Sequence, residues 1–289
     1  MVSTYIPKTL EEALIIRKET GARPLSGGTD LMVQYRRGIG VTPKFPWPIM
    51  IVSNLKELIG INETPDGSLC IGSATTSSEI AASPLVPWHV REASSRMGAI
   101  SLRNLATIGG NIGNASPKGD LPATLILLDA SVVLASVEGE RTVLLDDFIY
   151  GAKKTLLQDD EIITKIIIPK PARPFTYRWY RKIGTRRANA ITKLSLSAAI
   201  TIDEKGVITD FRASSGAAGP KIARNKALEA TLIGKNVEDI PSLLPSFLAD
   251  YDKIISPHAM PEYRRTSTKR MLEYFLTEVS KRPSGEIIE

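Results

Sequence analysis

The chain has 289 residues, enough to bury a sizeable core and to form two domains. Its composition, 43% apolar and 24% charged, is that of an ordinary globular protein, and no run of about 18 apolar residues predicts a membrane span. A single cysteine, Cys70, excludes an internal disulfide and any zinc or iron–sulfur site built from cysteines alone. The two histidines, His89 and His258, stand far apart without other ligands spaced around them, so we expect no metal on this chain.

The start of the sequence lacks the basic patch and apolar stretch of a secretory signal, and we expect a cytoplasmic protein. The net charge of +6 and the pI near 9.3 raise the alternative of a nucleic-acid-binding module. Basic residues are denser only in residues 173–193 and 263–270, and the first stretch holds aromatic residues that could stack on bases. A solvated surface with long basic side chains explains the same pattern, and we expect no nucleic-acid partner.

The first part of the chain is predicted to alternate short strands with short helices. Thr9 and Glu12 fit a capping box, and Gly21 suits the end of the helix that follows it. The predicted strands are Arg23–Ser26, Ile49–Val52, Ser68–Ile71, Ser131–Ser136 and Ile162–Ile168. The further helices predicted here are Leu31–Arg37, Ser77–Ala82, Pro87–Met97 and Ala123–Leu128.

The proline-rich segment Pro169–Pro174 is predicted to separate two domains. We expect a first domain at residues 1–172, with subdomains of about 1–52 and 53–172, and a second domain at residues 173–289. In the second domain the predicted strands are Phe175–Lys182, Leu194–Ile202 and Val207–Ser214, the last two forming a hairpin. The predicted helices are Ala223–Ile233 and about Glu262–Val279. The expected fold class is α+β.

Two glycine pairs lie roughly eighty residues apart, Gly27-Gly28 between a predicted strand and helix and Gly109-Gly110 further along. Such a pair lets the backbone approach a diphosphate with free N–H groups directed at the negative charge. One pair alone is also typical of any tight corner between a strand and a helix. Neither pair fits GxGxxG or GxxxxGK[ST], so the Rossmann and P-loop patterns are excluded. Together the pairs predict two loops that clasp one extended diphosphate from two sides.

Asp120 has two interpretations that the residues leave open. Its side chain can cap a helix that begins near Pro122, or it can accept a hydrogen bond from a ribose hydroxyl or another donor on a ligand. Both can hold at once.

Seven segments resemble, in chain order, the flavin-binding medium subunit of the xanthine dehydrogenase and carbon monoxide dehydrogenase family. They are SGGTDLMVQYRRG, IVSNLKELIGI, DGSLCIGSATTSSEI, SLRNLATIGGNIGNASPKGDLPATLILLDA, YRKIGTRRANAITKLSLSAAI, SSGAAGPKIARNKALEATLIGK and PEYRRTSTKRMLEYFL. The resemblance covers essentially the whole chain. It implies a two-subdomain FAD-binding domain of the PCMH type, also seen in vanillyl-alcohol-oxidase-like enzymes. It also implies a C-terminal α+β domain, in which helices cover a small antiparallel sheet.

The resemblance also implies the residues that hold FAD. The first loop would bind the diphosphate through Leu25, Ser26, Gly27, Gly28, Thr29, Asp30 and Leu31. The second loop would complete the clasp through Thr107, Ile108, Gly109, Gly110 and Asn111. Asp120 would contact the ADP portion, Ile163 would line the adenine end, and Lys182 would lie near the flavin, where a cation suits the negative charge of the reduced ring.

Two positions depart from the family pattern. Asn189 stands where the family usually has Asp, which could weaken a salt link in the C-terminal domain. Ser101-Leu102 replaces a common Gln-Ile beside the second loop and could tune its surroundings. With only Cys70, the chain cannot carry the additional four-iron cluster of some relatives.

The function implied by the resemblance is electron relay, and no residue of this chain need act as an acid–base catalyst. A large partner subunit would carry molybdopterin and oxidise the substrate, and a small partner subunit would carry two [2Fe-2S] clusters. We expect these three chain types to form a dimer of heterotrimers. The alternatives are a self-contained FAD-dependent oxidoreductase of the same fold and the basic binding module considered above. The substrate and the electron acceptor are not specified by this chain.

Overall fold

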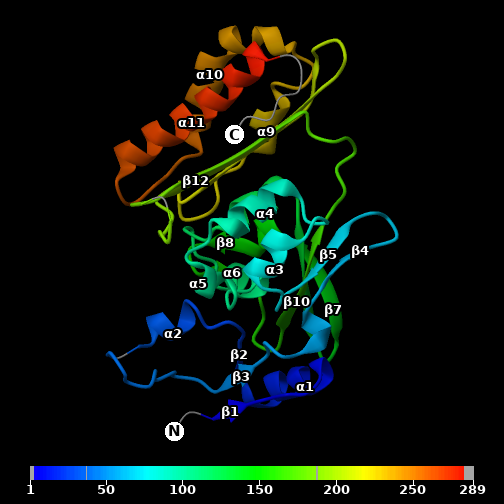
Figure 1. Ribbon diagram of the computed structural model, residues 1–289, viewed down its shortest axis with the longest axis vertical. Coiled ribbons are helices and arrows are strands. Elements are labelled where there is room, and N and C mark those ends of the chain that lie inside the picture. The colour runs from blue at the N-terminus through cyan, green and yellow to red at the C-terminus, as the bar shows by residue number, and fades with distance from the viewer. Residues whose placement is uncertain (1–2, 37, 187, 283–289) are drawn as a thin grey trace. The chain divides into compact units, whose positions relative to one another are not determined.

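The computed structural model describes residues 3–36, 38–186 and 188–282 (Figure 1). The chain forms two compact units, each of which combines helices with β-sheet, as the α+β prediction requires. The first unit comprises Met1–Ala115 and Asp129–Lys170, and the second comprises Ser116–Leu128 and Pro171–Glu289. Among the described residues, none of the helices is both long and apolar enough to cross a membrane.

The first unit begins with a small parallel sheet in the order β1-β3-β2. Its strands are β1 (Thr4–Tyr5), β2 (Arg23–Leu25) and β3 (Ile49–Ile51), and helix α1 (Leu10–Thr20) connects the first two. Thr9 accepts a hydrogen bond from the Glu12 N–H, as predicted, and Gly21 ends α1 with a left-handed φ of 65°. The Glu12 carboxylate accepts from the N–H of Lys8, one residue before the N-cap, and not from the N–H of Thr9 as a standard capping box would have it.

Helix α2 (Leu31–Gln34) is shorter than the predicted Leu31–Arg37. The chain leaves the helix at Tyr35, whose ring packs edge-on against Trp47 at 5.0 Å between centroids and tilted against Phe45 at 5.4 Å. These aromatic contacts and the hydrogen bond from the Lys44 N–H to the Tyr35 carbonyl draw the following loop back along the helix end. The last residue of the predicted helix, Arg37, lies outside the described residues.

A five-stranded antiparallel sheet in the order β4-β5-β10-β6-β7 forms the rest of the first unit. Its strands are β4 (Ile61–Glu63), β5 (Leu69–Gly72), β6 (Ser131–Ser136), β7 (Gly139–Leu144) and β10 (Ile162–Ile168). The shorter elements are η1 (Lys56–Leu58), α3 (Ser77–Ala82), α4 (Trp88–Ser95), α5 (Ile100–Arg103), α6 (Ile108–Gly113), α8 (Leu145–Phe148), β8 (Ile149–Gly151) and β9 (Lys154–Thr155). The central strand β10 is isoleucine-rich and mostly buried, which indicates that both faces of the sheet are covered at this strand.

An ion pair closes the beginning of β10 onto the sheet edge. Arg141 of β7 donates from Nη2 to Glu161 Oε2 at 2.8 Å, and the Gln158 N–H donates to the same oxygen at 2.8 Å. Burial alone would raise the pKa of Glu161, but the hydrogen bonds from Arg141 and Gln158 outweigh it and leave the pKa lowered. Arg17 of α1 adds a bond to the Glu161 carbonyl, so this carboxylate stays ionised at a junction of three elements.

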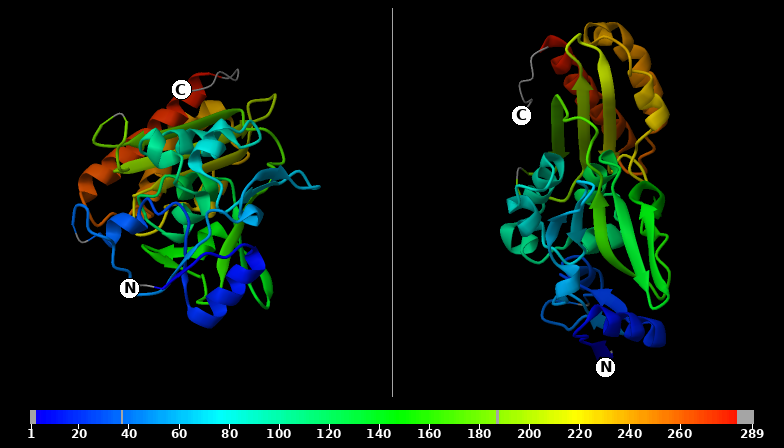
Figure 2. Two further views of the ribbon diagram at one scale, coloured as in Figure 1. Left: turned by 60° about the horizontal axis from the view of Figure 1, so that its bottom comes forward. Right: turned by 90° about the vertical axis from the view of Figure 1, so that its right-hand side faces the viewer.

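The second unit is built on an antiparallel sheet in the order β11-β12-β13. Its strands are β11 (Tyr177–Ile183), β12 (Leu194–Ile202) and β13 (Ile208–Gly216), and its later helices are α9 (Lys226–Ala230), η2 (Val237–Asp239), α10 (Ile240–Lys253) and α11 (Pro261–Lys281). Helices α10 and α11 pack side by side against one face of the sheet (Figure 2). Leu196, Phe211 and Phe275 are among the fully buried residues of that core. The predicted hairpin of β12 and β13 is present.

Two helices of the second unit differ from the prediction. The helix predicted at Ala223–Ile233 covers only Lys226–Ala230, because Ala223 instead pairs with Ser215 at the end of β13. Helix α10 was not predicted. Its apolar residues recur with helical spacing, but Pro241 and Pro245 lie within it and mimic a loop.

The segment Ser116–Leu128 belongs by packing to the second unit, although it is flanked in sequence by residues of the first. Its helix α7 (Leu121–Leu127) is buried along its length and lies on the sheet face opposite α10 and α11. Ser214 donates to the Ala123 carbonyl at 2.6 Å, and Arg212 donates to the Leu127 carbonyl at 3.3 Å. The predicted domains are divided at residues 172/173 in chain order, and the prediction did not place the segment Ser116–Leu128 with the second unit. The predicted boundaries stay a prediction.

Candidate functional site

The first glycine loop lies directly on the backbone that leads into the second. A Cβ atom placed on Gly27 would stand 1.7 Å from the carbonyl oxygen of Leu105 and 3.1 Å from the nitrogen of Ala106. Only glycine permits this approach. Gly28 adopts a φ of +66°, the left-handed conformation that favours glycine for a second reason. The first glycine loop thus lies against Leu105 and Ala106, directly before the second glycine segment, within the first unit.

The first loop presents a row of unused hydrogen-bond donors. In the described part of the chain, no hydrogen bond uses the backbone N–H groups of Gly27, Gly28, Thr29, Asp30 or Leu31. None of these five residues is fully buried, so their N–H groups can bond to water and remain available to a ligand. The buried hydroxyl of Ser26 likewise has no hydrogen-bond partner among the residues that the structure describes. Successive free backbone N–H groups in a turn are a common feature of anion-binding sites.

The second glycine segment is built differently, because the protein itself uses most of its donors. The segment forms the beginning of α6, with Thr107 as N-cap accepting from the Gly110 N–H at 3.2 Å. The N–H groups of Ile108, Gly109 and Asn111 donate to the carbonyls of Thr75, Ser73 and Thr107. A Cβ atom on Gly109 would come 2.6 Å from the Ser73 side chain, so this glycine serves close packing inside the unit.

What the second segment offers a ligand is a bare helix surface. Gly110 and Gly113, one helical turn apart on α6, are both exposed. Ile163 of β10 packs beneath them: its Cδ1 would lie 3.2 Å from a Cβ atom on Gly113, and the residue is 8% exposed. The structure therefore gathers the first loop, the second loop and Ile163 in the first unit.

Four polar side chains, none of them except Asp30 foreseen from sequence, connect the ends of the two loops. Asp30 lies within the free N–H row, next to its last residue, and pairs with Lys153 Nζ at 3.4 Å. Asn114, directly after α6, accepts from the Lys153 ammonium and from Gln34 Nε2, the latter at 3.2 Å. Gln34 also donates to the Asp30 carboxylate, which closes a ring of contacts. Asn114 and Lys153 are far in sequence from Asp30 and Gln34, so no local pattern connects the four residues.

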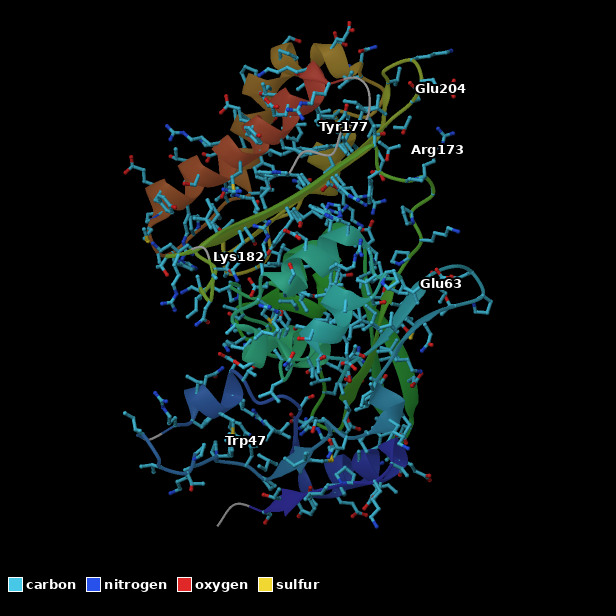
Figure 3. The ribbon with its side chains drawn as sticks, viewed as in Figure 1. Trp47, Glu63, Arg173, Tyr177, Lys182 and Glu204 are labelled. Carbon is cyan, nitrogen blue, oxygen red and sulfur yellow. The ribbon has the colours of Figure 1, made fainter. Side chains whose placement is uncertain are left out.

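Asp120 and Lys182 lie in the second unit and bond to each other. Asp120 Oδ1 stands 2.8 Å from Lys182 Nζ and accepts from the Thr192 hydroxyl at 2.6 Å. Lys182, near the end of β11, is labelled in Figure 3. The side chains of Asp120 and Lys182 are 12% and 7% exposed. Burial raises the pKa of Asp120, and the charge of Lys182 and the two hydrogen bonds oppose that rise.

The capping role considered for Asp120 is only half correct. Asp120 occupies the N-cap position of α7, with Pro122 inside the first turn as predicted, but its side chain makes no capping hydrogen bond. Its carboxylate instead ties the segment that contains α7 to β11 and to Thr192. The ion pair therefore has a clear structural role in the second unit.

Both positions that depart from the family pattern are described by the structure. Asn189 has a left-handed φ of 48°, which asparagine tolerates better than most residues, and its carbonyl accepts from Arg186 Nε at 2.8 Å. Ser101 and Leu102 lie in the short helix α5, just before the contact made by Gly27.

Two family models match the chain. The model described as FAD binding domain in molybdopterin dehydrogenase covers residues 1–171, which include both glycine loops and Ile163. The model described as CO dehydrogenase flavoprotein C-terminal domain covers residues 179–279, which include Lys182.

Curated relatives and solved structures agree with these matches. The nicotinate dehydrogenase FAD-subunit of Eubacterium barkeri is 33% identical over 83% of this chain and 83% of its own. The glyceraldehyde dehydrogenase medium chain of Sulfolobus acidocaldarius is 30% identical over 80% of this chain and 81% of its own. A reconstituted CO dehydrogenase from Oligotropha carboxidovorans superposes with a TM-score of 0.85, at 25% identity over 98% of both chains. The chain belongs to the FAD-binding medium subunits of the molybdenum hydroxylase family, which are components of oxidoreductases.

Proposed function

We propose that this chain relays electrons from a [2Fe-2S] partner subunit, through FAD, to an external acceptor. Bound FAD supplies the chemistry, because it can take up electrons singly and store two of them. The protein holds the cofactor and sets its surroundings, and no side chain of this subunit has to act on the organic substrate. Partner subunits with molybdopterin and with iron–sulfur clusters would complete the assembly, as a dimer of heterotrimers.

The observation that carries the cofactor proposal is the row of free N–H groups from Gly27 to Leu31. A diphosphate brings two negative charges and several acceptor oxygens, and backbone donors satisfy them without a metal or a basic side chain. The unpartnered Ser26 hydroxyl adds a further donor at the edge of the row. These features suit the diphosphate of FAD better than they suit a neutral ligand.

The remaining site residues take different roles in this proposal. Thr107 to Asn111 would give the cofactor a surface without bulky side chains at its glycines, whose N–H groups are mostly hydrogen-bonded within the protein. Ile163 would pack beneath that surface. Leu25 precedes the donor row and would contribute apolar contact. The roles expected for Asp120, at the ADP portion, and for Lys182, near the flavin, are proposed on the resemblance alone.

The names of the relatives support the proposed partners. Medium chains and FAD-subunits are by name parts of larger dehydrogenases. The relatives act on different substrates, which fits a shared electron-relay subunit whose substrate is chosen elsewhere in the complex. For this chain we therefore propose an assembly in which the substrate is selected by the molybdenum subunit.

Purification of the intact complex tests the relay. We expect molybdenum, iron and FAD to co-purify with three chain types. The visible absorption of the flavin should bleach when a substrate is added without oxygen. A chain that binds FAD, carries no metal partners and oxidises a substrate alone would instead favour the self-contained oxidoreductase. A complex whose metal centres are reduced by substrate while the flavin stays oxidised would contradict the relay.

A further inference from the structure

We propose that Lys153 is a positioning residue for FAD, which cancels the charge of Asp30 beside the diphosphate loop and fixes that loop to the end of α6. The inference rests on the proposed FAD site. Lys153 belongs to neither glycine motif and lies more than a hundred residues after the first loop.

The backbone places Lys153 for this task. It occupies the turn between β8 and β9 with a left-handed φ of 59°, a conformation that lysine rarely adopts. Its N–H donates at 2.8 Å to the carbonyl of Ala115, itself left-handed with a φ of 44°. Such backbone outliers persist where surrounding contacts require them and often mark functional sites. Here they bring the turn to the residue that directly follows Asn114.

The side chain of Lys153 then bridges the two loops. Its ammonium contacts the Asn114 amide oxygen, and it lies 3.4 Å from the Asp30 carboxylate. Gln34 bonds to the same two acceptors and completes the ring. Asp30 and Asn114 belong to different segments, one within the free N–H row and the other directly after α6. The ring is thus a side-chain connection between the segments, additional to the backbone contact of Gly27 with Leu105.

The charge of Asp30 explains why the bridge is a lysine. The Asp30 carboxylate stands at the end of the N–H row that would hold the diphosphate, where like charges repel. Lys153 supplies the opposite charge within ion-pair distance. The side chains of Lys153 and Asp30 are 48% and 56% exposed, so water and salt screen their interaction and the expected effect is moderate.

The test compares FAD affinity among variants of the purified, flavin-stripped full chain. We expect Lys153→Met to weaken FAD binding by roughly three- to fivefold at low salt, the upper part of the range for a partly screened ion pair. Lys154→Met is the matched control, because it removes the same charge from the next residue. Lys154 lies in β9 and is exposed. It should bind FAD within about twofold of the wild type. Lys153→Arg should keep most of the affinity.

Two further measurements separate charge from a loosened fold. Asp30→Asn combined with Lys153→Met should recover affinity relative to Lys153→Met alone, because the uncompensated carboxylate is gone. The penalty of Lys153→Met should also shrink in roughly 0.5 M salt, where the Debye length falls to a few ångströms. Unfolding temperatures of the apoproteins check that each variant is folded.

The outcomes distinguish this inference from the proposed function. If the wild type binds FAD and Lys153→Met binds it equally well, Lys153 has no positioning role and the FAD site stands. If Lys153→Met is weaker but neither Asp30→Asn nor salt reduces the difference, the charge argument is wrong. If the wild type itself does not bind FAD, the proposed function fails and the inference falls with it.

Discussion

Replacing Gly27 by alanine tests the closest contact of the proposed FAD site. The added methyl group would stand 1.7 Å from the Leu105 carbonyl oxygen and 2.5 Å from its carbon, whereas real Cβ contacts essentially never fall below 3.0 Å. The two backbones must therefore separate by roughly 1.3 Å, the difference of those distances, since neither neighbour is a side chain that can rotate away. The φ of Gly27 is not left-handed, so the contact alone is perturbed.

The expected cost follows from this displacement. Overpacking of this kind costs about 1–3 kcal/mol of stability. If the shift also removes one hydrogen bond between the N–H row and a charged diphosphate, binding should lose roughly 1.5–3 kcal/mol, or about 10- to 100-fold in Kd. Gly38→Ala is the control, because a Cβ atom there would meet only the Val41 side chain at an ordinary 3.4 Å.

Titration of flavin-stripped protein with FAD, followed by flavin fluorescence, measures the affinity, and thermal unfolding measures the stability. We expect Gly27→Ala to lose affinity and Gly38→Ala to keep it. Equal FAD affinity in the wild type, Gly27→Ala and Gly38→Ala would refute the reasoning that the first loop must lie on Leu105 to bind the cofactor.

Other predictions follow from the ion pairs. Asp120→Ala should lower the free energy of unfolding by about 3–5 kcal/mol, because it leaves the Lys182 ammonium buried without its carboxylate; an unfolding midpoint unchanged in urea would contradict this. Glu161→Gln should lower stability at pH 7, because the pKa of Glu161 is lowered by Arg141 in the folded chain. That contribution is present above the unfolded pKa near 4.5 and is lost as pH falls through the folded pKa, so the two stability curves should converge in acid and stay parallel if the pair contributes nothing.

The sequence was most informative where a local rule fixes the structure. Gly21 ends α1 because the left-handed φ at this position suits glycine. The run of apolar residues in β10 predicts a strand that is buried on both faces. The motif around Gly109-Gly110 identified the family, and the family then supplied the fold. In each case a few neighbouring residues carry the whole signal.

The rest depends on contacts between distant segments. The sequence could not show that Gly27 lies against Leu105. Nor could it show that N–H groups of the second glycine segment donate to the carbonyls of Ser73 and Thr75. Lys153 escaped notice because an isolated lysine in a turn is ordinary until its backbone conformation and partners are known.

Two other differences have the same origin. Helix α10 was hidden by Pro241 and Pro245, since the sequence pattern of a proline-containing helix resembles that of a loop. The pairing of Asp120 with Lys182 joins residues that are more than sixty positions apart, and no local rule connects them. Asp120 occupies the N-cap position of α7 without a capping hydrogen bond, because its carboxylate bonds to Lys182 and Thr192 instead.

Flavin content is the most direct test of the central claim that this chain holds FAD. The purified full chain should show the absorption of bound flavin, or regain it on addition of FAD, and denaturation should release about one FAD per chain. A colourless protein that fails to take up added FAD, while remaining folded by circular dichroism, would contradict the account.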